Sequence, residues 1–175
     1  FFYTQSVAEN LNIQSLNMTV DKKTKITIFQ NQVSAKDEKN NQLLTELAEY
    51  DKNLQSLKTI GKTTVITSEG YLINGENFVF DNIKNIITSN NSATIKDLEN
   101  NEIYLENFEY STLDNLFQSV GKIKIIDSKQ NIYNFTQIYI DEKKREIVGT
   151  DARTFLNEDS FKVDKRNKPR IFCVL

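Results

Sequence analysis

A period of 30 residues is the feature that most constrains how this chain can fold. At this spacing, four columns are apolar in all five successive copies. They are Ile13, Leu43, Ile73, Ile103 and Tyr133; Met18, Ala48, Phe78, Phe108 and Ile138; Val20, Tyr50, Phe80, Tyr110 and Ile140; and Ala35, Val65, Ile95, Ile125 and Phe155. With 38% apolar residues, a column is fully apolar by chance in roughly 0.8% of cases, so ~30 columns yield about 0.2 by accident. The sequence therefore predicts an array of repeated units.

The local pattern within each copy is typical of β-strands. Phe78 and Phe80 stand two residues apart, as side chains on one face of a strand must. A turn residue follows at once, in the column Asp21, Asp51, Asp81, Ser111 and Asp141. A second strand then carries Leu57, Ile87, Phe117 and Ile147. Each copy thus predicts at least a strand, a turn and a second strand.

A second corner is predicted where the second strand ends. Its column reads Asn31, Gly61, Asn91, Gly121 and Asp151. Gly, Asn and Asp are the residues that tolerate a left-handed backbone, so the chain is expected to bend there. A third short segment follows, as in TTVIT, SATIK and KIKII, and then a polar loop.

One segment also has helical spacing. In Gln42–Asp51 the apolar residues Leu43, Leu44, Leu47 and Tyr50 would fall on one face of a helix. The same segment keeps the 30-residue register of its β neighbours. We therefore predict a strand here, and an all-β fold throughout.

Stacking five such copies predicts an elongated structure of two sheets with an apolar seam between them. About five strands per sheet at ~4.8 Å give a stack on the order of 25 Å long. Such a stack has unpaired strands at both ends, of which Ile13–Val20 is expected to be the first.

The composition excludes several classes of function. Histidine is absent and Cys occurs once, which removes His-based metal sites, Ser-His-Asp and Cys-His catalysis, and a disulfide within the chain. The net charge of −2 provides no basic field for nucleic acid. We predict no catalytic residue, no metal and no cofactor, and hence not an enzyme.

The two ends of the chain depart from the repeat. Residues 1–8 (FFYTQSVA) contain a small-x-small pattern, Ser6-Val7-Ala8, and are interpreted as a signal-peptide remnant, with a frayed terminus as the alternative. Residues 9–160 form the predicted repeat domain. Residues 161–175 (FKVDKRNKPRIFCVL) are interpreted as an exit segment, and its lone Cys173 is either a partner for a cysteine outside the chain or a free thiol.

The repeat resembles the OstA-like repeats of the lipopolysaccharide transport proteins. Three segments carry the pattern of strand, turn, apolar strand and Gly-x-Val or Gly-x-Ile: TVDKKTKITIFQNQV, EYDKNLQSLKTIGKTTV and EYSTLDNLFQSVGKIKI. In the first, Asn31 stands where the family usually has Gly. IDSKQNIYNFTQIYI and NKPRIF resemble the member whose repeat domain precedes an outer-membrane barrel. The resemblance covers residues 9–172 and lies in the succession of short motifs.

This resemblance implies a β-jellyroll in the periplasm that passes the acyl chains of lipopolysaccharide along an apolar groove. The predicted groove lining is Met18, Val20, Tyr50, Phe78, Phe80, Phe108, Tyr110, Ile138 and Ile140. The resemblance also implies an LptA-like bridge protein docked on an edge strand containing Ile13, Leu16, Met18 and Val20. It further implies an outer-membrane β-barrel with its lipoprotein plug partner, joined through a region beyond this chain. The family often has a cysteine near the mature N-terminus, where this sequence has none.

Three alternatives stay open at this point. The lining residues suit the filled core of a β-sandwich as well as a groove. The carboxylates of Asp51, Asp81 and Asp141 could serve a polysaccharide-cleaving enzyme, although their shared turn position favours a structural role. The many Asn residues of the loops could belong to an exported carbohydrate-binding or adhesive β-sandwich.

Overall fold

The computed structural model describes residues 4–8 and 11–157, and they contain strands and turns but no helix. The predicted all-β class is therefore confirmed, and there is no helix in this part of the chain that could cross a membrane. The predicted exit segment 161–175, with Cys173, lies outside the described residues. The strands are β1 (Thr4–Ala8), β2 (Leu11–Ser15), β3 (Asn17–Asp21), β4 (Ile26–Asp37), β5 (Gln42–Asp51), β6 (Ser56–Thr59), β7 (Lys62–Ile66), β8 (Leu72–Glu76), β9 (Val79–Asp81), β10 (Ile86–Ser89), β11 (Ala93–Lys96), β12 (Glu102–Leu105), β13 (Phe108–Ser111), β14 (Leu116–Ile126), β15 (Ile132–Asp141), β16 (Glu146–Thr150) and β17 (Arg153–Phe155).

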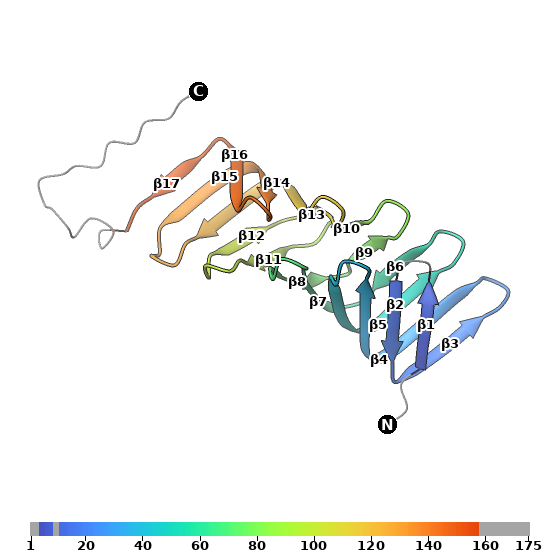
Figure 1. The fold of residues 1–175 in the computed structure, drawn as a ribbon. Helices are drawn as coiled ribbons and strands as arrows, with labels where there is room; N and C mark the ends of the chain where they lie inside the picture. Colours follow the sequence, from blue (N-terminus) through green and yellow to red (C-terminus); the bar gives the residue numbers. More distant parts are fainter. Residues whose placement is uncertain (1–3, 9–10, 158–175) are drawn as a thin grey trace, which may run out of the picture.

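All the strand pairings are antiparallel, and they build two layers along an elongated molecule (Figure 1). One layer, called layer A, runs in the order β1, β2, the second half of β4, the first half of β5, β7, β8, β11, β12, the second half of β14, the first half of β15 and β17. Layer B runs in the order β3, the first half of β4, the second half of β5, β6, β9, β10, β13, the first half of β14, the second half of β15 and β16. The long strands β4, β5, β14 and β15 pass through both layers and join them into one hydrogen-bonded sheet.

Each 30-residue copy contributes two strands to each layer. In the copy that starts at β8, the chain runs through β8 in layer A, β9 and β10 in layer B, and β11 back in layer A. The expectation of about five strands per sheet was therefore wrong, because the polar loops are hairpin turns that add a strand to each layer. Ten strands at ~4.8 Å give a stack on the order of 50 Å, about twice the predicted length.

The Gln42–Asp51 segment is a strand, β5, as predicted. Its apolar residues do not form a helix because β5 pairs along its whole length with β4. Leu43, Ala48 and Tyr50 are buried between the layers, while Glu46 is exposed. The tertiary ladder thus overrides the local helical spacing.

The corner column adopts the predicted left-handed backbone in four of its five copies. Asn31, Gly61, Gly121 and Asp151 have φ of 62°, 82°, 125° and 53°. Asn91 does not, so the prediction is wrong in that copy. There the chain turns through a bend at 90–91, and the backbone amide of Asn91 donates to Ser89 Oγ at 3.1 Å.

The N-terminal end differs from the predicted arrangement. Thr4–Ala8, placed within a signal-peptide remnant by the sequence, forms strand β1 along β2. The sheet therefore begins before the predicted boundary at residue 9. The expected single edge strand from Ile13 to Val20 is divided by a bend at Leu16 into β2 of layer A and β3 of layer B.

Candidate functional site

The inner face of layer B carries one row of side chains across ten strands, and every member except Thr27 is apolar. Antiparallel register makes its members direct cross-strand neighbours. From the N-terminal end, the row reads Val20, Thr27, Tyr50, Leu57, Phe80, Ile87, Tyr110, Phe117, Ile140 and Ile147. We call it the inner row. It unites the predicted column of Tyr50 with the predicted second-strand column of Leu57.

Layer A supplies the opposing wall of the interior. Its row reads Ile13, Ala35, Leu43, Val65, Ile73, Ile95, Ile103, Ile125 and Tyr133. Two of the predicted columns thus alternate along one line of cross-strand contacts. The column fails only at Phe155, because β17 pairs with β15 one residue out of step, so that Thr154 stands opposite Tyr133. Phe155 is 61% exposed as a result.

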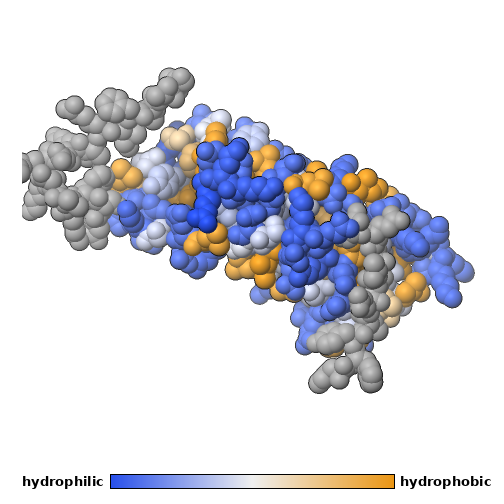
Figure 2. Space-filling view, viewed as in Figure 1, coloured by the Kyte–Doolittle hydropathy of each residue, from blue (hydrophilic) through white to orange (hydrophobic). Residues whose placement is uncertain are grey.

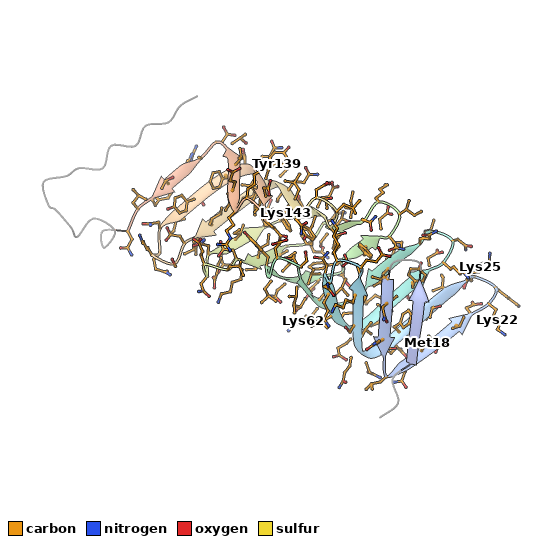
Figure 3. All side chains as sticks on the ribbon, in the orientation of Figure 1. Met18, Lys22, Lys25, Lys62, Tyr139 and Lys143 are labelled. Atoms are coloured by element: carbon orange, nitrogen blue, oxygen red, sulfur yellow. The ribbon has the colours of Figure 1, made fainter. Side chains whose placement is uncertain are left out.

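The predicted groove-lining residues divide into two groups. Tyr50, Phe78, Phe80, Phe108, Tyr110, Ile138 and Ile140 are buried between the layers. Met18 and Val20 lie on edge strand β3, where they are 36% and 52% exposed. At the other end of the inner row, Ile147 is 40% exposed. The row is therefore covered in its middle and open at both ends; Figure 3 shows Met18 at the N-terminal end.

The aromatic side chains fill the middle of the interior in this structure. Phe78 packs edge-on against Phe108 with ring centroids 5.0 Å apart, and Phe108 stacks on Phe117 at 5.0 Å. Tyr110 and Phe117 follow at 5.9 Å. A cavity bordered by Leu57 and Val65 measures about 20 Å³, which is room for one water molecule and not for an acyl chain. Lipid can occupy this part of the interior only if the layers move apart.

A buried carboxyl group lies beside the inner row, and the sequence reasoning did not identify it. Glu142 is 3% exposed, and the Tyr110 hydroxyl donates to its Oε2 at 2.9 Å. Burial raises the pKa of Glu142 from 4.5 to about 7, while hydrogen bonds from Tyr110, Thr67 and Asn115 act in the opposite direction. Burial and this carboxyl group together raise the pKa of Tyr110. The only signal in the sequence was an acidic residue where the same column has Asn82 and Thr112.

The turn aspartates serve the backbone, as the sequence predicted. Asp21 Oδ1 accepts from the Lys23 amide at 2.8 Å, and Asp51 Oδ1 accepts from the Asn53 amide at 2.8 Å. Asp81 and Asp141 accept turn amides in the same way. Backbone hydrogen bonds lower the pKa of Asp21 and Asp141. The largest contribution comes from the Lys23 amide for Asp21 and from the Lys144 amide for Asp141. This arrangement does not favour a pair of catalytic carboxylates.

The predicted docking strand is only partly at an edge. Ile13 belongs to β2, which pairs with β1 on one side and β4 on the other. Leu16 lies in the bend, where its amide donates to the Asn31 carbonyl at 3.0 Å. Met18 and Val20 are on β3, which among the described strands pairs only with β4. Within the described part of the chain, β1 and β3 are therefore the edges at the N-terminal end, and β16 and β17 are the edges at the other end.

The outer face of layer A carries a groove of about 1110 Å³ that crosses β7, β8, β11, β12, β14 and β15. Its outward side chains include Lys62, Asn74, Thr94, Tyr104, Lys124 and Asn134. None of its lysines forms an ion pair with the described residues. Figure 2 shows that one face of the molecule is largely hydrophilic, with scattered hydrophobic patches.

No family model and no curated protein sequence matches this chain. Among solved structures it is similar to LptH from Pseudomonas aeruginosa, described as the LptA-homologous periplasmic component of the conserved lipopolysaccharide transport device. The similarity covers 84% of this chain and 94% of LptH, with 11% sequence identity and a TM-score of 0.33. A TM-score at this level is below the range in which a common fold or function is inferred.

Proposed function

We propose that this domain is a periplasmic scaffold and conduit in lipopolysaccharide transport, and that acyl chains travel along its inner row. The observation that supports this proposal is the row itself, which passes through ten strands with Thr27 as its one polar member and ends in the exposed side chains of Val20 and Ile147. Burial of an acyl chain on such a surface contributes ~25 cal/mol per Å² and has little directional preference. A ligand held in this way can slide from strand to strand.

The finer assignment is to the N-terminal domain of LptD. It is favoured by the sequence segments IDSKQNIYNFTQIYI and NKPRIF. On this assignment the domain is attached to the outer membrane through a C-terminal barrel and its lipoprotein plug partner. The gene sequence downstream of the Leu175 codon tests this assignment, because barrel strands encoded there would distinguish it from the soluble members of the family.

The bridge partner is proposed to add a strand at the N-terminal end of the stack. Edge strands β1 and β3 each have one side there without a partner among residues 4–8 and 11–157. Main-chain hydrogen bonds supply affinity in strand addition without a specific sequence. The proposed docking surface is therefore β3, with Met18 and Val20, together with β1, in place of the segment around Ile13.

Site-specific photo-crosslinking tests the conduit. A photoreactive residue at Phe78 or Phe108 is expected to label with lipid A, because both positions face the interior. The control is Lys52, which is exposed in a turn of layer B and should remain unlabelled. Equal labelling at the three positions contradicts the proposal.

A second candidate function is binding of a carbohydrate. The groove on the outer face of layer A favours it, since amides, hydroxyls and the Tyr104 ring are groups that recognise sugars. The crosslinking experiment separates the two functions. Absence of lipid labelling at Phe78 and Phe108, together with retention of the protein on an immobilised oligosaccharide, would support the carbohydrate-binding alternative.

A further inference from the structure

Hairpins of the two layers meet on the side of the molecule opposite the corners. Hairpins 37–41 and 67–71 of layer A touch hairpins 111–116 and 141–146 of layer B through polar side chains. Asn115 Nδ2 donates to Ser68 Oγ at 3.1 Å, and the Lys39 ammonium group donates to the Leu113 carbonyl. We call the side chains that bridge the layers here the polar seam: Asn41, Thr67, Ser68, Tyr110, Asn115 and Glu142.

The polar seam joins parts of the chain that no strand ladder joins. The Tyr110 hydroxyl and Asn41 Oδ1 are 3.5 Å apart, and their residues are separated by 69 positions in the sequence. Ser68 and Asn115 are 47 positions apart. The hydrogen bonds of each layer run within that layer or through the corners. The hairpins can therefore separate at the seam without breaking a strand pair. The layers cannot separate at the corners in this way, because the long strands pass through them.

Glu142 is the group in the seam whose charge depends on pH. Its carboxyl group is buried, and it faces Tyr110 from β13 and the 67–71 hairpin, which contributes Thr67, Tyr71 and Glu69. Glu69 adds a second negative charge on that hairpin. The pKa of Tyr71 is raised by the charges of Asp97 and Glu99 and lowered by that of Arg145, which belongs to the same hairpin as Glu142. No cation of the described residues forms an ion pair with Glu142, so ionisation of this buried carboxyl group disfavours the closed seam.

We propose that the polar seam is a gate to the inner row, and that ionisation of Glu142 opens it by separating the hairpins of layer A from those of layer B. The role as a lipid gate rests on the proposed function, whereas opening controlled by pH does not. An acyl chain would reach the filled interior sideways through this opening.

The direction of the pH dependence follows from the burial of Glu142. Its pKa is about 7 in the closed seam, above the ordinary 4.5, so protonation stabilises the closed form. That stabilisation is complete below about pH 4.5 and is lost as the pH rises through about 7. The difference corresponds to a fall on the order of 100-fold in the ratio of closed to open forms.

Distance measurements between spin labels test the gate in the full chain without lipid. Labels are attached to Glu38→Cys and Leu113→Cys, which are exposed positions on opposite sides of the seam, with Cys173→Ser removing the native thiol. A single short distance is expected at about pH 5, and a longer, broader distribution at about pH 8.5. Glu142→Gln should keep the short distance at both values, because its amide stays uncharged.

Glu146→Gln is the matched control, since Glu146 lies at the end of the same hairpin but is exposed. It should keep the wild-type response. An unchanged distance in the wild type over this pH range, or the same lengthening in Glu142→Gln, would overturn the proposal. Circular dichroism confirms that each variant retains its strands.

Uptake of pyrene-labelled palmitate separates the gate from the proposed function. At about pH 8.5, uptake by Glu142→Gln should be at least tenfold slower than uptake by the wild type, given the 100-fold shift above. Equal uptake by the two proteins despite different label distances would refute the gating role. If the labels move apart with pH and no palmitate enters either protein, the conduit function fails while the pH-controlled seam stands.

Discussion

At the scale of single residues, the hairpins repeat a small set of hydrogen bonds. In three hairpins of layer A an Asn side chain binds the Asp four residues before it: Asn41 with Asp37, Asn101 with Asp97, and Asn131 with Asp127. The Nδ2 group of each Asn makes that bond, and its Oδ1 accepts a backbone amide about 27 residues further along, from Ser68, Ser128 and Asn157 respectively. Each Asn therefore closes its own turn and ties it to the neighbouring copy.

Asn101 offers a test of this double role. Asn101→Ala removes the 2.6 Å hydrogen bond to Asp97 Oδ2 and leaves the Ser128 amide without its acceptor. We expect a loss of about 1–2 kcal/mol in the free energy of unfolding, measured by urea denaturation. Asn100→Gly is the matched control, since Asn100 has φ of 64°, which Gly adopts freely, and its effect should stay within about 0.5 kcal/mol. Equal losses in the two variants would contradict the assigned role.

The turns also show why residue identity alone does not locate every left-handed position. Lys25, Gln55, Asn85, Asn115 and Arg145 form a second column with 30-residue spacing, with φ between 48° and 60°. Lys, Gln and Arg are not typical residues for this conformation. Lys25 and Gln55 are held in it because the carbonyl of each of the first four residues accepts a backbone amide of the following copy; Lys52, for example, donates to Lys25 at 3.1 Å. The hydrogen bond comes from the neighbouring copy of the repeat, so the local sequence around the turn does not reveal it.

At the scale of strands, the close approach of two glycines to aromatic rings fixes where the chain turns between layers. A Cβ added to Gly75 would lie 2.7 Å from the Phe78 ring, and one added to Gly149 would lie 2.4 Å from the Phe135 ring. Phe78 cannot move aside readily, since it is fully buried and packs on Phe108. The end of β8 therefore needs a residue without a side chain.

Gly75→Ala tests this packing. We expect a destabilisation of about 1–3 kcal/mol, because the new methyl group displaces the Phe78 ring from its contact with Phe108. Gly61→Ala is the comparison, because a Cβ there meets open space and only the φ of 82° is unfavourable. Its expected cost is roughly 1 kcal/mol. If urea denaturation shows a smaller loss of stability for Gly75→Ala than for Gly61→Ala, the Phe78 ring moves aside without cost, which contradicts the prediction.

At the scale of the whole molecule, the stack has two ends with different edges. β1 and β3 are open at the N-terminal end, and β16 and β17 at the other. The exposed ends of the inner row lie on β3 and β16. A partner that continued the sheets would also continue the row, so the proposed docking and the proposed transport would share the same surface.

Substitutions at the two ends test which of them binds the proposed bridge partner. Met18→Glu places a charge on the inner side of β3 and is expected to weaken association with an LptA-like protein by at least tenfold, because the charge would be buried between the joined sheets. Val148→Glu, on edge strand β16, is the control and should leave association unchanged. Sedimentation or calorimetric titration measures both affinities. Weakening by Val148→Glu alone would assign docking to the C-terminal end.

The sequence by itself determined the β class, the 30-residue unit, the turn role of Asp21 and Asp51, and the inward-facing columns of Phe78 and Phe108. These features depend on local alternation and on residue types with strong turn preferences, which are readable along the chain. The doubled strand number was not readable, since a polar loop such as 67–71 is consistent with a hairpin or with a crossing between sheets.

Only the tertiary structure decided which side chains of the two layers lie opposite each other. It showed that Phe78, Phe108 and Phe117 fill the middle of the interior, and that Val20 is exposed at the end of the same row. It also brought Glu142 to Tyr110 and the 67–71 hairpin. Contacts between copies two or more units apart depend on how far the layers are twisted against each other. Neither hydrophobic period nor turn chemistry encodes that twist, because it results from the packing of all the strands together.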